Sequence, residues 1–134
     1  MIHVCPLSLL HKTVEDTGAR HVVSLIGDEV IIERPSAVVE ENYLRLRLHD
    51  ISSPLDGYIM PDEEHIADLL RFVRRWDRRA PMVVHCYAGI SRSTASAFAS
   101  VCAMLASVAA YVLAPAVNAC TNCSWNAATR ALSC

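Results

Sequence analysis

Short β-branched runs alternate along this chain with segments whose apolar residues recur at helical spacing. The clearest run is HVVSLI at residues 21–26, which is bounded by Gly27 and Asp28 and predicts a buried strand and a turn. The predicted strands cover residues 21–26, 43–49 and 82–84, and the predicted helices cover residues 6–18, residues 61–79 and a stretch from about residue 93. Strands that alternate with helices predict an α/β domain, with a central, mostly parallel sheet flanked by helices.

Two of these elements carry further detail. In residues 43–49, leucines alternate with Arg45, Arg47 and His49, which predicts a strand with one face in the core. Acidic residues follow Pro61 and arginines crowd the other end of the same segment, as the helix dipole favours. Residues 28–35 fit either a strand or a loop.

Composition narrows the class of protein. The 134 residues are about one domain's worth, and 53% hydrophobic against 19% charged residues excludes disorder and collagen-like sequence. A formal charge of −2 argues against nucleic acid as a partner. The six cysteines are scattered, and the N-terminus shows no signal-peptide pattern, so we expect a protein of the cytoplasm.

The segment from His85 to Ser93 lies between a predicted strand and a predicted helix. Its backbone amides can converge at the helix N-terminus and form a cradle for an anion. Gly89 permits the tight curl that such a cradle needs. The same donors stabilise a thiolate at Cys86, while the planar guanidinium of Arg92 can bind two phosphate oxygens at once. The segment therefore predicts a phosphate site with a nucleophilic cysteine.

The letters HCYAGISRS resemble the signature of the cysteine-based protein tyrosine phosphatases, in which His-Cys, five residues and Arg precede Ser or Thr. The AG and SRS details are most similar to the dual-specificity branch, in a small, bacterial-type form. The similarity extends over residues 2–113. It implies a phosphotyrosine-phosphatase-like fold with the Cys-X5-Arg loop between strand and helix.

The resemblance also implies roles for single residues. Cys86 would attack phosphorus and form a phosphocysteine, Ser93 would assist its breakdown, and His85 would support the loop and the thiolate by hydrogen bonding. Arg92 would hold the phosphoryl oxygens together with the loop amides, and no metal or other cofactor is implied. The residues implied in substrate binding are Tyr87, Ala88, Gly89, Ile90, Ser91 and Arg92.

The family further requires a general acid on a separate loop. Asp50, at the end of the predicted strand 43–49, corresponds best to the family's aspartate. Asp56 lies on the following loop and is nearer to Cys86 in sequence, so it remains the alternative acid.

Other residues have simpler interpretations. We interpret His49 and His65 as a surface and a helix-face histidine, and the arginines within residues 71–79 as a solvated helix end rather than as a docking site for an acidic partner. Cys120 and Cys123 form a CXXC pair, but with only one further cysteine and no histidine nearby we expect no metal site.

Residues 93–129 contain no Lys, Arg, Asp or Glu. Residues 97–117 are long enough to span a membrane, but their alanines, serines and Pro115 favour a helix buried in the core. We expect a catalytic domain at residues 1–114 and an atypical tail at residues 115–134, whose native ending is replaced or truncated, for example by a change of reading frame.

The expected activity is phosphomonoester hydrolysis on a phosphorylated protein or peptide, by a monomer that does not act at a membrane. A phosphate-binding module with little turnover, and thiol chemistry of the rhodanese or arsenate-reductase type, remain the alternatives.

Overall fold

The computed structural model of the chain describes residues 1–119, with side chains described through residue 106. Residues 1–104 form one compact unit, and the chain from residue 105 belongs to a second unit. The sheet and the candidate site both lie in the first unit.

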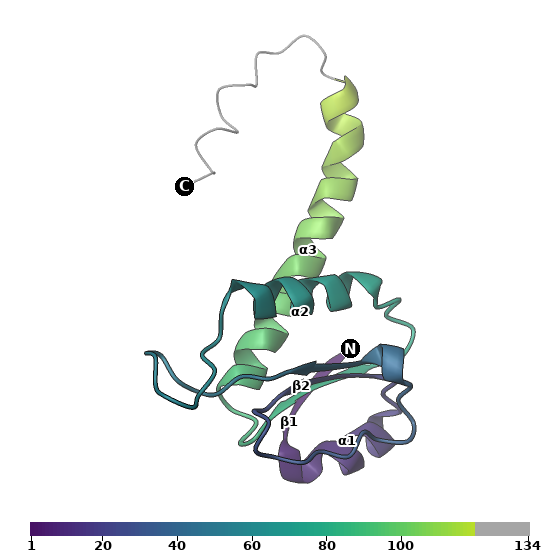
Figure 1. Cartoon of the computed structure of the whole chain (residues 1–134). Coiled ribbons are helices and arrows are strands. Elements are labelled where there is room, and N and C mark those ends of the chain that lie inside the picture. Colours follow the sequence, from purple (N-terminus) through teal and green to yellow (C-terminus); the bar gives the residue numbers. More distant parts are fainter. Residues whose placement is uncertain (120–134) are drawn as a thin grey trace. The chain divides into compact units, whose positions relative to one another are not determined.

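The first unit is built on a four-stranded sheet in which all pairs are parallel (Figure 1). The strands are β1 (Ile2–Pro6), β2 (His21–Leu25), β3 (Tyr43–Leu46) and β4 (Met82–Cys86). Their order is β1-β4-β2-β3, so β4 lies inside the sheet and all five of its residues are buried. The predicted α/β fold with a parallel sheet is confirmed.

Helices cover both faces of this sheet. Figure 1 shows α1 on one face and α2 on the other. The helices are α1 (Leu10–Thr17), which follows a 3-10 turn at Leu7–Leu9, α2 (Glu63–Arg75) and α3 (Arg92–Ala119), and a second 3-10 turn at Glu40–Asn42 precedes β3.

Two clusters of buried side chains form the core, one on each face of the sheet. Neighbouring residues of one strand, such as Val22 and Val23 in β2, belong to different clusters because successive side chains of a strand point to opposite faces. The cluster on the α1 side contains Cys5, Leu10, Val14, Ala19, Val22, Val38 and Val83. The cluster on the α2 side contains Val23, Leu25, Leu46, Leu48, Leu69, Phe72, Val73, Trp76, Met82, Val84 and Cys86. Partly buried residues of α3, among them Ala97 and Met104, pack against this second cluster.

Most element boundaries agree with the predicted ones. Gly18 ends α1 in the left-handed region at φ 67°, and Asp62 caps α2 by accepting a hydrogen bond from the amide of His65 at 3.0 Å. Two details differ from the expectations: β3 ends at Leu46 rather than at residue 49, and β1 was not predicted. Residues 28–35, which fitted either a strand or a loop, form a loop.

The C-terminal expectations are only partly open to inspection. In the part of the chain that the structure describes, no helix has the combination of length and hydropathy needed to cross a membrane. α3 continues past residue 114, the expected end of the catalytic domain, to Ala119. The rest of the expected tail, including Cys120 and Cys123, lies outside the described residues.

Candidate active site

The turn between β4 and α3 forms the centre of the candidate site. Cys86 is the last residue of β4, and Arg92 is the first residue of α3. Between them, Gly89 adopts a positive φ of 73°, which allows the backbone to curl back toward the sulfur. The Leu7 amide donates a hydrogen bond to the Tyr87 carbonyl at 3.2 Å, which fixes the start of the turn to the end of β1. The turn thus leads from the end of β4 to the N-terminus of α3 and brings the Gly89 amide to the Cys86 sulfur.

The sulfur of Cys86 is enclosed by donors. Cys86 is only 1% exposed, and its Sγ lies 3.2 Å from the Oγ of Ser93. The Gly89 amide donates to the same Sγ at 3.2 Å. Burial acts to raise the pKa of Cys86, but the Ser93 hydroxyl and the amides of Ser93, Gly89 and Ile90 outweigh it, so the pKa lies below its ordinary value. The site therefore favours a thiolate.

Arg92 is held on the other side of the loop by main-chain oxygens. Its Nη1 donates to the carbonyls of Leu25 at 3.0 Å and Leu48 at 2.9 Å, at or just beyond the ends of β2 and β3. Its Nε is buried without a hydrogen-bond partner and lies 3.8 Å from Oδ2 of Asp50. Because Nη1 is held by two carbonyl oxygens, only the other nitrogens of the guanidinium could bind an oxyanion.

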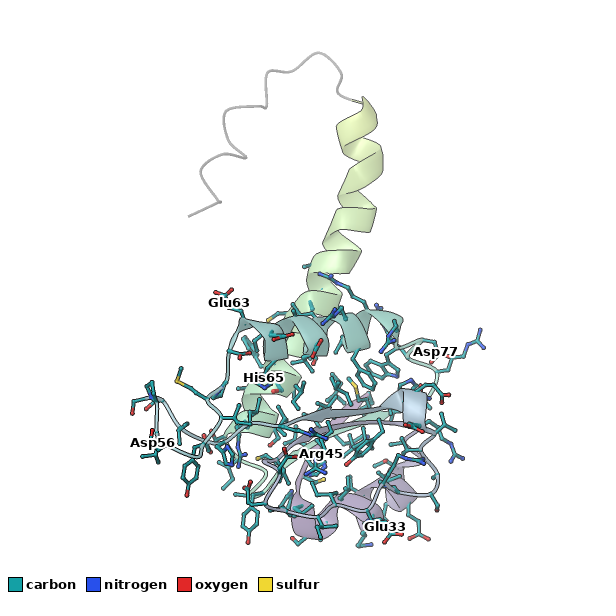
Figure 2. All side chains as sticks on the ribbon, viewed as in Figure 1. Glu33, Arg45, Asp56, Glu63, His65 and Asp77 are labelled. Carbon is teal, nitrogen blue, oxygen red and sulfur yellow. The ribbon has the colours of Figure 1, made fainter. Side chains whose placement is uncertain are left out.

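The two candidate acids are placed differently. Ser91 Oγ donates to Oδ1 of Asp50 at 2.9 Å, so Asp50 lies at the loop and beside Arg92. Asp56 is exposed, and Figure 2 shows it near the outer end of the loop that follows β3. Among the described residues, no hydrogen bond or ion pair joins Asp56 to the turn at 87–92. The structure thus brings Asp50, and not Asp56, to the predicted phosphate site.

The other residues of the turn between Cys86 and Arg92 form an exposed rim around the Cys86 sulfur. The side chains of Tyr87, Ala88, Ile90 and Ser91 are exposed, with Tyr87 65% and Ile90 75% accessible to solvent. Of these four residues, Ile90 also directs its amide toward the sulfur of Cys86.

Comparison with known proteins identifies the family. The family model described as protein-tyrosine phosphatase matches residues 54–124, more than half of the chain. The chain belongs to the protein-tyrosine phosphatase family. A search of curated proteins finds no match.

A solved structure has the same fold as this phosphatase-family chain. The PTP-2 phosphatase of Cydia pomonella superposes with a TM-score of 0.55 at 21% sequence identity. The similarity covers 72% of this chain and 61% of the other, so the chain spans less than two thirds of that relative's length. The predicted phosphatase-like fold is confirmed.

His85 occupies a different environment from the one expected. It is fully buried in β4, and among the described residues neither ring nitrogen has a hydrogen-bond partner. Burial, and to a smaller extent the charge of His11, lowers the pKa of His85 to about 4. The ring is therefore neutral near pH 7, and the hydrogen bond that the resemblance implied from it to the thiolate is not observed.

Some functional contacts were not predictable from the motif. The carbonyl oxygens that hold Arg92 belong to Leu25 and Leu48, and a backbone oxygen has no signal in the sequence.

A cavity of about 230 Å³ also lies beside Arg92 and Asp50. Its lining is mostly apolar and consists of Leu25, Leu46, Leu48, Asp50, Pro61, His65, Ile66, Leu69, Ser91, Arg92, Ala95 and Ser96. Among the described residues, no group of three or more His, Cys, Asp or Glu side chains gathers in a way that could hold a metal ion.

Proposed function

We propose that this protein hydrolyses phosphotyrosine in proteins or peptides through a phosphocysteine intermediate. The observation that carries the proposal is the sulfur of Cys86, which is buried among amide and hydroxyl donors, has a lowered pKa and lies in the loop that ends at Arg92. Membership of the protein-tyrosine phosphatase family supports the same reaction class.

In the first step the Cys86 thiolate attacks phosphorus and forms an S–P bond as the bond to the leaving oxygen breaks. Arg92 and the loop amides stabilise the charge that spreads over the three equatorial oxygens. Asp50 gives its proton to the leaving oxygen. Its hydrogen bond from Ser91 and its position beside Arg92 support this role.

In the second step Asp50, now a carboxylate, takes a proton from water, and the oxygen of that water attacks phosphorus. The S–P bond breaks, and its electron pair returns to Cys86. The Ser93 hydroxyl, 3.2 Å from the sulfur, stabilises the departing thiolate, which supports its assignment to this step. Inorganic phosphate then leaves the loop.

The substrate preference within phosphoproteins follows from the rim. Exposed Tyr87 and Ile90 give an apolar surface on which an aromatic ring can lie, which favours phosphotyrosine over phosphoserine or phosphothreonine.

Cys5, Cys86 and Cys102 are free thiols, which supports a reducing compartment such as the cytoplasm.

The test is turnover of 4-nitrophenyl phosphate by the wild-type protein and by Cys86→Ser, followed by phosphotyrosine and phosphothreonine peptides of one sequence. We expect turnover that the Cys86→Ser change abolishes and that orthovanadate inhibits competitively. Phosphate binding without turnover would instead identify a binding module, and transfer of sulfur or reduction of arsenate would identify thiol chemistry.

A further inference from the structure

His49 holds the base of the loop that carries Asp50. The amide of His49 donates to the carbonyl of Ile59 at 2.7 Å, and the amide of Ile59 donates to the Nδ1 of the His49 ring at 2.8 Å. One residue thus makes two hydrogen bonds to Ile59 and closes residues 50–58 into a loop. Asp50 is the first residue of this loop and lies directly beside the closing contact.

The ring of His49 is fixed on its other sides as well. Its Nε2 lies 3.0 Å from Oε2 of Glu29, and Tyr58 packs edge-on against it with the ring centroids 4.8 Å apart. A Cβ atom on Gly27 would lie 2.3 Å from Nε2 and 2.2 Å from the Glu29 oxygen, so the glycine leaves the room that this pair occupies. The His49 side chain is only 13% exposed.

These contacts determine which nitrogen of the neutral ring carries the proton. A backbone amide can only donate, so Nδ1 accepts from Ile59 and carries no proton. The proton of the neutral ring is therefore on Nε2, where it is donated to the Glu29 carboxylate. Because both nitrogens are engaged, His49 has no free position from which to act as a proton donor in place of Asp50.

We propose that His49 is a positioning residue for Asp50, an inference that rests on the proposed function. By binding Glu29 on one side and Ile59 on the other, His49 acts as a clamp that closes residues 50–58 and holds Asp50 at the phosphate loop, residues 86–92. Ser91 and Arg92 contact the carboxylate of Asp50 from the phosphate loop, but both contacts need the backbone of Asp50 to be held in place. The clamp supplies that constraint. A general acid displaced by about 1 Å loses on the order of 10²-fold in rate, so a loose loop base weakens protonation of the leaving group.

Two substitutions separate the two nitrogens of the ring. The side-chain oxygen of His49→Asn reaches the position of Nδ1 and can still accept from Ile59, whereas the longer side chain of His49→Gln reaches the position of Nε2 and can contact only Glu29. We expect kcat/KM for phenyl phosphate to stay near the wild-type value in His49→Asn and to fall by about 10²-fold in His49→Gln. Because 4-nitrophenolate leaves readily without a proton, and because kcat/KM reports only the steps up to formation of the phosphocysteine, kcat/KM for 4-nitrophenyl phosphate changes little in either variant.

A double substitution shows whether His49 acts through Asp50. If it does, His49→Gln adds no further loss for phenyl phosphate when Asp50→Asn is already present. An equal loss in kcat/KM for both substrates, or an additive loss in the double variant, would show that His49 serves only the stability of the fold and would overturn the proposal. Equal activity of His49→Gln and the wild-type protein on phenyl phosphate would overturn it as well.

Hydrogen exchange gives a readout that does not depend on catalysis. We expect the Ile59 amide to exchange faster in His49→Gln than in the wild-type protein and to remain protected in His49→Asn. If the wild-type protein shows no turnover that depends on Cys86, the proposed function fails while the exchange of Ile59 still decides the clamp. Unchanged protection of Ile59 in His49→Gln refutes the clamp whatever the activity.

Discussion

The backbone of Gly89 lies directly against that of Pro6. A Cβ atom on Gly89 would lie 2.5 Å from the Pro6 nitrogen and 2.7 Å from the carbonyl carbon of Cys5. Pro6 is also the register partner of Cys86 in the β1–β4 pair. The turn around the sulfur is therefore packed against the end of β1, with no room for a side chain at its centre.

Gly89→Ala should disable the loop because the clash is with main chain rather than with a flexible side chain. We expect a loss of 4-nitrophenyl phosphate turnover of at least about 10²-fold, as for other displaced catalytic groups. Gly18→Ala is the matched control, since Gly18 also has a positive φ of 67° but no atom within 4 Å of its Cβ position. It should lose only about 1–2 kcal/mol of stability and keep its activity. Equal turnover in the two variants contradicts the close packing.

Cys86 should react with iodoacetamide at a pH below the ordinary range of a cysteine thiol. The thiolate is the reactive form, and hydrogen bonds lower the pKa of Cys86 despite its burial. Ser93→Ala removes the hydroxyl 3.2 Å from the sulfur and should move the alkylation profile of Cys86 to higher pH while leaving that of Cys102 in place. Mass spectrometry of the labelled peptides measures both sites at once. A Cys86 profile in the ordinary range of a cysteine thiol would count against the thiolate.

Asp50→Asn should lower kcat for phenyl phosphate by about 10²- to 10⁴-fold, the range expected for a general acid. Asp56→Asn, a change of the same kind on the same loop, should have little effect because, within the described part of the chain, Asp56 makes no hydrogen bond or ion pair with residues 87–92. Steady-state kinetics on both variants checks the assignment. The reverse result would transfer the role to Asp56.

Stability should fall as the pH drops from about 6.5 toward 4 because of His85. The unfolded chain binds a proton at the ordinary pKa of 6.5, whereas the buried ring, with a pKa of about 4, does not. The unfolded state therefore binds more protons in this window, and the free energy of unfolding rises with pH until about 6.5. The contribution of this group is about 3 kcal/mol over the full window.

NMR titration of the His85 ring, together with urea unfolding at each pH, measures this effect. His85→Gln removes the titrating group, so its unfolding free energy should depend less on pH between 4 and 6.5. If this variant does not fold, the ring titration decides alone: a His85 pKa near 6.5 in the folded protein refutes the explanation.

The sequence was sufficient for the parts of this protein that depend on periodicity or on turn chemistry. The acidic start and basic end of α2, the glycine at the end of α1 and the alternating residues of β3 each correspond to one local physical preference. The phosphate loop was predictable because Cys86, Gly89 and Arg92 are close in sequence and act within one turn.

The parts that were missed depend on contacts between distant residues. The sequence of β1, IHVCP, shows no sustained alternation of apolar and polar residues, and only Cys5 in it is buried. It forms a strand because it pairs with β4. His49 was interpreted as a surface histidine because its face of the strand carries Arg45 and Arg47. Its partners Glu29 and Ile59 come from two loops whose paths no local pattern specifies.

The pairing of β1 with β4 has a consequence for how the site is assembled. Ile2 is aligned with Met82, so the first strand of the sheet and the strand that bears Cys86 come from distant parts of the compact unit. Contacts between such distant segments form late and slow the search for the native state. During synthesis, β1 can pair with β4 only after nearly the whole unit has left the ribosome. Binding of an anion that requires the finished loop would therefore report complete folding of the unit.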